Sequence, residues 1–146
     1  MTSPYLIPDL KSDEGLRLAA YPDPLSHGEP FTIGWGHCGS DVHPGVVWTI
    51  NQAEDALARD VQGVISGLDA SLSWWRTLSD IRQDVLVNMG FELGVHGVLG
   101  FPETLSAIQS GNYVIADRDM LQSRWADQVP GRADRLALQM ETGAHA

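Results

Sequence analysis

The chain has 146 residues, which is enough for one domain that buries its own core without disulfide staples. Hydrophobic residues make up 43% and charged residues 19%, a globular mixture that excludes a disordered or fibrous chain. The formal net charge of −10 argues against a nucleic-acid binder or a basic membrane-surface peptide, because both need clustered positive charge.

The number of cysteines and the hydropathy of the chain narrow the class of protein further. Cys38 is the single cysteine, so no internal disulfide can form, and no Cys/His cluster has the spacing of a zinc site. Residues 1–13 lack a basic segment followed by an apolar run, so we expect no Sec-type signal peptide. Polar residues interrupt the apolar stretch 85–101, which predicts a core helix or helix pair. We therefore expect a soluble protein made in the cytoplasm, without stable membrane insertion.

The first predicted element is an amphipathic helix over about residues 3–19. Its candidate core residues are Leu6, Leu10, Leu16 and Leu18. Residues 21–39 follow, rich in Pro, Gly and aromatics, with a β-prone run at 31–33. This composition predicts a small hairpin or sheet with its turn at residues 25–28.

A helix start is predicted at Thr49, because Thr49 and Gln52 have the spacing of a capping box. Apolar residues recur at helical intervals to about Leu68, namely Ala53, Leu57, Val61, Val64 and Ile65. The remainder is predicted to form four or five short helices, separated by Gly and Pro. Strands segregated from helices in this way indicate an α+β domain.

Two carboxyl groups and a hydroxyl stand out near the predicted sheet. Glu14 ends an acidic pair, Asp23 lies between two prolines, and Thr32 opens the run Thr-Ile-Gly-Trp-Gly-His. Glycoside hydrolysis needs one protonated and one ionised carboxyl group across a cleft. Spacing alone is weak evidence, because the chain's 19 acidic residues offer many such pairs.

Several sequence blocks together resemble the phage-type lysozymes of glycoside hydrolase family 24. The blocks occur in order over nearly the whole chain, at residues 14–18, 21, 23, 32–37, 88–94, 97–101, 123–128 and 130–135. The resemblance implies one lysozyme-like domain over residues 1–146. In it, a sheet lobe (about 20–48) and a helical lobe (69–146 plus the N-terminal helix) are joined by the helix at about 49–68, with a cleft between the lobes.

The resemblance also implies an activity. Members of this family are endolysins that hydrolyse the β-1,4 bond between N-acetylmuramic acid and N-acetylglucosamine in peptidoglycan. Glu14 aligns with the general acid, and Asp23 and Thr32 align with the residues that position the water. The implied mechanism inverts the anomeric carbon, which predicts carboxyl groups roughly 6.5–9.5 Å apart. No metal and no organic cofactor is implied.

Further residues receive roles by the same resemblance. Positions that contact saccharide align with Cys38, Phe91, Glu92, Thr104 and Asp119. Arg132 is expected beside Glu14, and Arg135 with Asp13, although both arginines could simply tie the last helix to the first. An ion pair between His37 and Asp60 is expected to join the small sheet to the long helix.

The remaining candidates have stronger structural explanations. Trp125 is expected in the core, whereas Trp35 could contact a sugar. His27, His43, His96 and His145 are expected in loops or facing solvent. Neighbouring residues on a strand point to opposite faces, so His37 and Cys38 cannot form a thiol-peptidase dyad, although a distant partner for Cys38 stays possible.

Two departures from the family matter. Eight residues separate Asp23 from Thr32, more than is common, so the hairpin turn carries extra residues and Glu29 could replace Asp23. The net charge of −10 gives no attraction toward an anionic wall, which predicts weak binding at low salt and an optimum where salt screens the repulsion.

Two other functions stay open. A lytic transglycosylase would share the fold and Glu14, but would not need Asp23 and Thr32. A non-catalytic glycan-binding virion module would share the fold alone. For an endolysin we expect peptidoglycan strands as substrate, a monomer, and release from the host cytoplasm to the periplasm through a phage holin.

Overall fold

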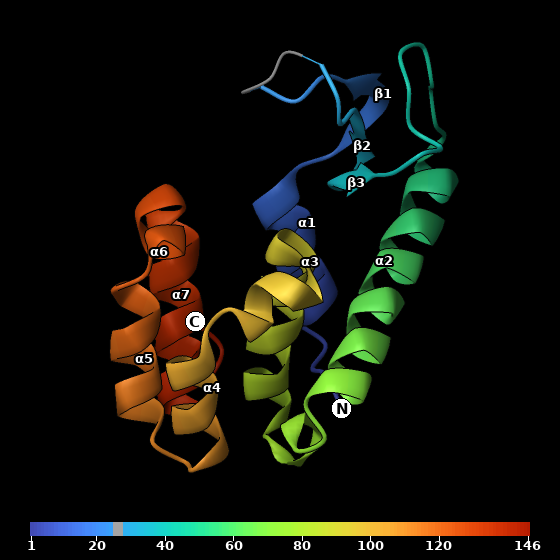
Figure 1. Cartoon of the computed structure of the whole chain (residues 1–146). Helices are drawn as coiled ribbons and strands as arrows, with labels where there is room; N and C mark the ends of the chain where they lie inside the picture. Colours follow the sequence, from blue (N-terminus) through green and yellow to red (C-terminus); the bar gives the residue numbers. More distant parts are fainter. Residues whose placement is uncertain (25–27) are drawn as a thin grey trace. The chain divides into compact units, whose positions relative to one another are not determined.

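The computed structural model describes residues 1–24 and 28–146 of the chain. Its elements in chain order (Figure 1) are α1 (Leu6–Glu14), β1 (Arg17–Tyr21), β2 (Thr32–Gly34), β3 (His37–Cys38), α2 (Ile50–Ser71), the 3-10 helix η1 (Trp75–Thr77), α3 (Asp80–Leu99), α4 (Pro102–Gln109), α5 (Tyr113–Leu121), α6 (Arg124–Gln128) and α7 (Pro130–Thr142). Helices with a small antiparallel sheet confirm the predicted lysozyme-like α+β fold.

Contacts between residues divide the chain into two compact units. Ile7–Gly63 forms the first, which we call the sheet unit, and Met1–Leu6 with Val64–Ala146 forms the helical unit. In this division α1 groups with the sheet from Ile7 onward, and the predicted lobe bounds stay a prediction. The single domain over 1–146 stays a prediction.

The first helix is shorter than predicted. It ends at Glu14, because Gly15 adopts a left-handed backbone with φ 70° while its N–H still donates to the Lys11 carbonyl at 3.0 Å. Leu10 is fully buried, as expected, and Leu6 is 3% exposed. The prediction of Leu16 and Leu18 as helical core residues was wrong, since both follow the turn and are 38% exposed.

The sheet has the strand order β1-β2-β3, with both pairs antiparallel. A bulge shifts the register between β1 and β2, so that Arg17 pairs with Gly34 but Tyr21 pairs with Thr32. The small sheet is thus confirmed. Of its predicted turn at 25–28, residues 25–27 lie outside the described residues.

Helix α2 begins where the capping box predicts. The Thr49 N–H donates to Gln52 Oε1 at 2.8 Å, and the Gln52 N–H donates to Thr49 Oγ1 at 3.2 Å. Ala53, Leu57 and Val61 form its buried stripe. The helix continues three residues beyond the predicted end, to Ser71.

The helical unit is held by apolar packing. Helix α7 packs against α3, α5 and α6, and α4 packs against α5. Helix α3 is interrupted at Gly94, where φ is 75° and ψ is 157°, so the predicted helix or helix pair at 85–101 is a pair. Fully buried side chains line this core, including Leu86, Met89, Ile108, Met120, Leu136 and Met140.

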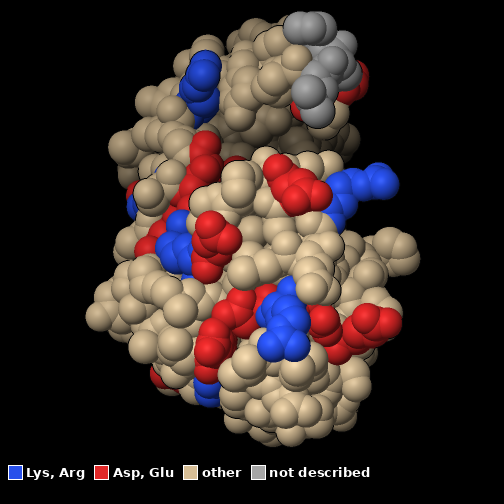
Figure 2. Space-filling view, turned by 90° about the vertical axis from the view of Figure 1, so that its left-hand side faces the viewer, with Lys and Arg blue, Asp and Glu red and all other residues tan. Residues whose placement is uncertain are grey.

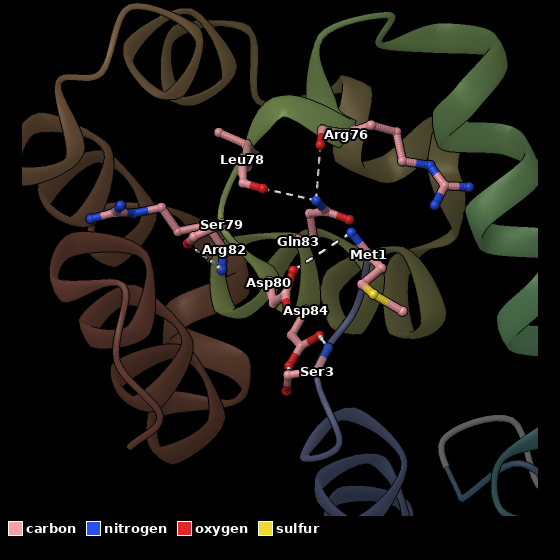
Figure 3. Close-up of polar contacts among 9 residues, drawn as sticks. All are labelled: Met1, Ser3, Arg76, Leu78, Ser79, Asp80, Arg82, Gln83 and Asp84. Carbon is pink, nitrogen blue, oxygen red and sulfur yellow. Dashed lines mark hydrogen bonds and ion pairs between the residues drawn. The ribbon is translucent and has the colours of Figure 1, made fainter.

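Polar contacts fasten the chain start to α3 (Figure 3). The buried carboxylate of Asp84 accepts hydrogen bonds from the Ser3 N–H, at 2.8 Å, and from the Ser3 hydroxyl. The amino nitrogen of Met1 lies 3.6 Å from Asp80 Oδ1. Beside them, the Gln83 amide nitrogen donates to the Leu78 carbonyl at 2.8 Å and fixes the turn before α3.

Arg82 joins three helices of this unit. Its Nε donates to the Met140 carbonyl at 2.7 Å and its Nη2 to the Glu141 carbonyl at 2.8 Å, so it caps the last turn of α7. Its guanidinium lies 3.5 Å from the ring centroid of Tyr113, the first residue of α5. One side chain of α3 thus fixes both neighbours.

Within the described part of the chain, no single helix has the length and hydropathy of a membrane span. Helices α3 and α4 reach both only when taken together, across a bend of 102°.

Candidate active site

The three predicted catalytic residues all belong to the sheet unit. Glu14 is the last residue of α1, Asp23 follows β1, and Thr32 begins β2. All three are partly exposed, so each can meet a solute. Because Tyr21 pairs with Thr32, β1 and β2 bring the Asp23 loop and Thr32 to the same end of the sheet.

The carboxyl group of Glu14 lies against the turn between β2 and β3. A Cβ added to Gly36 would come within 2.7 Å of Glu14 Oε2 and 3.1 Å of its Cδ. Gly36 also has φ 76°, a left-handed backbone that favours glycine. The second glycine of the Thr-Ile-Gly-Trp-Gly-His run therefore makes the space that this carboxyl group occupies.

Cross-strand pairing places Cys38 beside Thr32. Tyr21, Thr32 and Cys38 form one row across the sheet, and directly paired residues share a face. Cys38 is exposed, and its thiol is free. Ile33 and His37 form the next pair and face the other side, so the adjacent His37 and Cys38 cannot form a dyad, as predicted.

The backbone of Asp23 is hydrogen-bonded to that of Gly28. The Asp23 N–H donates to the Gly28 carbonyl at 3.0 Å. Glu29, the alternative second carboxylate, is exposed just beyond it. Asp23 as the second carboxylate, with Glu29 as its alternative, stays a prediction, and His27 lies outside the described residues.

His37 lies between two carboxylates. Its Nδ1 is 2.8 Å from Asp60 Oδ2 on α2, the contact that the resemblance implies, and its Nε2 is 3.1 Å from Asp41. Burial of the ring lowers the pKa of His37, but the hydrogen bonds and charges of Asp60 and Asp41 outweigh it. The net result is a pKa above its ordinary value of 6.5. Asp41 was not anticipated as a second partner.

Trp35 and Lys11 form a further contact of the sheet unit that the sequence did not reveal. Trp35 is only 7% exposed, which disfavours its alternative role as a sugar contact. The Lys11 ammonium lies 4.4 Å from the centroid of a Trp35 ring and 2.6 Å from Glu54 Oε1 on α2. Lys11 thus ties the last turn of α1 to two other segments.

In the helical unit, predicted residues gather around Glu92. The Trp125 indole N–H donates to Glu92 Oε1 at 2.9 Å, and Arg132 Nε lies 3.5 Å from the same oxygen. Arg132 Nε also donates to Asn88 Oδ1 at 2.9 Å. Trp125 is 4% exposed, which confirms its place in the core. Phe91, next to Glu92, is partly buried.

The predicted pairings of Arg132 with Glu14 and of Arg135 with Asp13 join residues of different units. Both stay predictions.

Two hollows of the helical unit share Gly100 and Phe101 in their walls. One, of about 370 Å³, brings together Thr104 and Asp119, two of the predicted saccharide contacts. The other, of about 390 Å³, is lined by Trp125, with Ser123, Arg124 and Gln128 as its polar side chains. The helical unit therefore has concave surface with polar side chains at the predicted positions.

The surface is mixed in charge. On the face drawn in Figure 2, acidic side chains border most of the basic ones, which are scattered rather than gathered. Over residues 1–24 and 28–146, no three His, Cys, Asp or Glu side chains are arranged to hold a metal ion.

Known proteins are similar to this chain in sequence. A family model described as "Phage lysozyme" matches residues 11–137. The endolysin of Bacillus phage B103 is 37% identical over 77% of this chain and 41% of its own length. A probable T4-type lysozyme 1 of Dictyostelium discoideum is 26% identical over 92% of both chains. The pre-baseplate central spike protein Gp5 of Enterobacteria phage T4 is 30% identical over 92% of this chain and 27% of its own length.

The endolysins of Bacillus phages B103 and PZA are longer than this chain, which spans about two fifths of their length. The family model nevertheless covers most of the chain, including the Glu14, Asp23 and Thr32 positions. The sequence and its α+β fold lead to one conclusion: this chain belongs to the phage lysozyme family.

Proposed function

We propose that this protein is a muramidase that hydrolyses the β-1,4 bond between N-acetylmuramic acid and N-acetylglucosamine in peptidoglycan. The observation that carries the proposal is that the Glu14 carboxyl group packs against Gly36. Asp23 and Thr32 belong to the same unit. Membership of the phage lysozyme family, and relatives named as endolysins, support it.

The reaction follows from these groups. Glu14, in its protonated form, donates a proton to the glycosidic oxygen while the bond to the anomeric carbon breaks. Asp23 stays ionised, stabilises the oxocarbenium-like transition state, and accepts a proton from the attacking water. The Thr32 hydroxyl can donate to the carboxylate and accept from that water at once. The water attacks from the face opposite the leaving group, so the configuration inverts.

The saccharide is proposed to contact Cys38, Phe91, Glu92, Thr104 and Asp119. Cys38 lies beside Thr32 in the sheet, and Thr104 and Asp119 share a hollow. Arg132, Arg135, Asp13, His37 and Asp60 are proposed to support the site. The proposed setting is the periplasm, reached by a monomer through a phage holin.

A virion component is the second candidate. The similarity of this chain to the T4 central spike protein favours it, since 92% of this chain matches a part of that protein. A transglycosylase is less well supported, because it would use the sugar's own hydroxyl and leave Asp23 and Thr32 without a role.

Product analysis tests the proposal. Purified peptidoglycan is digested with the protein, and the new sugar ends are identified by mass spectrometry. Reducing muramic ends are expected. Anhydro ends would instead identify a transglycosylase, and binding without cleavage would favour a non-catalytic virion module.

The second carboxylate has its own test. Asp23→Asn should abolish cleavage, whereas Glu29→Gln should retain it. Loss of activity in Glu29→Gln alone would transfer the role to Glu29.

A further inference from the structure

We propose that Gly36 and Lys11 are positioning residues that determine the position of the Glu14 carboxyl group. The proposal rests on the proposed function, because it assigns Glu14 the proton donor's role. It concerns residues outside the three groups that act on the substrate, and it follows from contacts within the sheet unit alone.

Gly36 determines the position of the Glu14 carboxyl group because it has no Cβ. A Cβ there would lie 2.7 Å from Glu14 Oε2, 3.1 Å from Cδ and 3.4 Å from Cγ. Real Cβ atoms almost never come as close as the first of these distances, so any other residue would push the carboxyl group away. General acid catalysis depends on placing the proton within hydrogen-bond reach of the leaving oxygen.

Lys11 holds the backbone that carries Glu14. It lies three residues earlier on α1, and its carbonyl accepts the Gly15 N–H that ends the helix, at 3.0 Å. Its ammonium bonds Glu54 of α2 at 2.6 Å and lies 4.4 Å from the centroid of a Trp35 ring. Trp35 immediately precedes Gly36, so Lys11 anchors α1 to the same turn that makes room for the carboxyl group.

Gly34 supplies a matched control. It lies in the same run, has φ 65°, and its added Cβ would meet Trp48 Cζ3 at 3.1 Å rather than Glu14. Gly34→Ala and Gly36→Ala therefore impose similar backbone strain, and each new Cβ makes a close contact, at 3.1 Å with Trp48 and at 2.7 Å with Glu14, so only the second disturbs Glu14.

The first test measures kcat and KM on a soluble peptidoglycan fragment, with thermal melts of each variant. We expect Gly36→Ala to lower kcat about 100-fold with KM nearly unchanged, because a displacement of about 1 Å can cost that factor. Gly34→Ala should lose similar thermal stability and keep kcat within about threefold. Equal kcat values for the two variants would overturn the proposal.

The second test uses Lys11, in case the glycine variants fold poorly. Lys11→Met removes the ion pair and the cation–π contact but keeps the aliphatic stem, and should lower kcat about threefold to tenfold. Lys11→Arg keeps both interactions and should restore kcat. A Lys11→Met enzyme with wild-type kcat would contradict the anchoring role.

Failure of the proposed function is distinguishable from failure of this inference. If the wild-type protein cleaves no glycan, the muramidase proposal fails, and crystal structures of wild type and Gly36→Ala still test the inference. A displaced Glu14 carboxyl group in the variant is expected, and an unmoved one would overturn it.

Discussion

Both units of this protein bury apolar side chains, among them Leu10 and Ile33 in the sheet unit, but they differ in the elements that this packing holds. The helical unit depends on apolar side chains, with Leu86, Met89 and Leu136 almost completely buried. In the sheet unit the strands are only five, three and two residues long, and glycines with positive φ shape their connections at Gly34 and Gly36. Polar contacts, such as those of Lys11 and His37, tie this unit together.

The difference teaches where this chain can tolerate change. A core tolerates substitution of one apolar side chain by another of similar volume, because its stability is distributed over many contacts. A turn in which a missing side chain makes room for a carboxyl group tolerates almost none. We therefore expect substitutions in the helical unit to change stability first, and substitutions around Glu14 to change activity first.

The largest stability effect should come from the helical core. Leu136→Ala on α7 removes a side chain that is 1% exposed and should lower the free energy of unfolding by about 2–5 kcal/mol. Leu138→Ala, on the same helix but 47% exposed, is the matched control and should change it by less than about 0.5 kcal/mol. Urea unfolding measures both, and similar losses would contradict a core-dependent helical unit. At temperatures where it is folded, Leu136→Ala should keep wild-type kcat.

A smaller effect is expected at Arg82. Arg82→Met removes the donors to the carbonyls of Met140 and Glu141 and the contact with Tyr113, and should cost about 2 kcal/mol. Faster amide exchange at the end of α7 should accompany the loss. Arg118→Met on α5, an exposed position, serves as the control. Equal melting temperatures for the two variants would show that Arg82 does not join these helices.

The His37 contacts predict a pH-dependent effect in the sheet unit. The pKa of His37 is raised in the folded protein, so the stabilisation is complete below the ordinary value of 6.5 and is lost as pH rises through the folded value. Asp60→Asn should therefore lower the free energy of unfolding by about 1–2 kcal/mol at pH 5.5, and by clearly less at pH 8.5. A loss of the same size at both pH values would mean that charge on His37 is not involved.

The smallest effect on the free energy of unfolding is expected at Asp117, between α5 and α7. Burial, a hydrogen bond with Glu141 and the charges of Glu141 and Asp134 raise the pKa of Asp117 to about 6. The folded state therefore favours the protonated carboxyl group, and stability falls as pH rises from about 4 through 6. Asp117→Asn should stabilise the protein at pH 7.5 by less than about 1 kcal/mol, with Asp127→Asn as an exposed control. Destabilisation at that pH would contradict the repulsion.

Sequence patterns predicted the features whose causes are local. The capping box located the start of α2, and the polar interruptions of the apolar stretch 85–101 predicted a helix or helix pair where α3 has its break. The predicted first helix is too long, because the apolar period continues past Gly15, although a glycine at this position is itself a helix-end signal.

The features that were missed depend on contacts distant in sequence. Gly36 meets Glu14 across 22 positions, and Arg82 meets Met140 across 58. The periodicity of a short stretch of sequence does not predict contacts between residues so far apart. The candidate acid itself was found through resemblance to a family, since spacing alone could not select Glu14 from the other acids.

The most direct test of the central claim compares the wild-type protein with Glu14→Gln on purified peptidoglycan, with thermal melts of both. The variant keeps the size of the side chain and removes the proton it would donate, so cleavage should fall about 1000-fold while the melting temperature stays close to wild type. Reducing muramic ends that appear with the wild type and are absent with the variant are the predicted result. Equal amounts of the same ends from both proteins would contradict the assignment of Glu14 as the general acid.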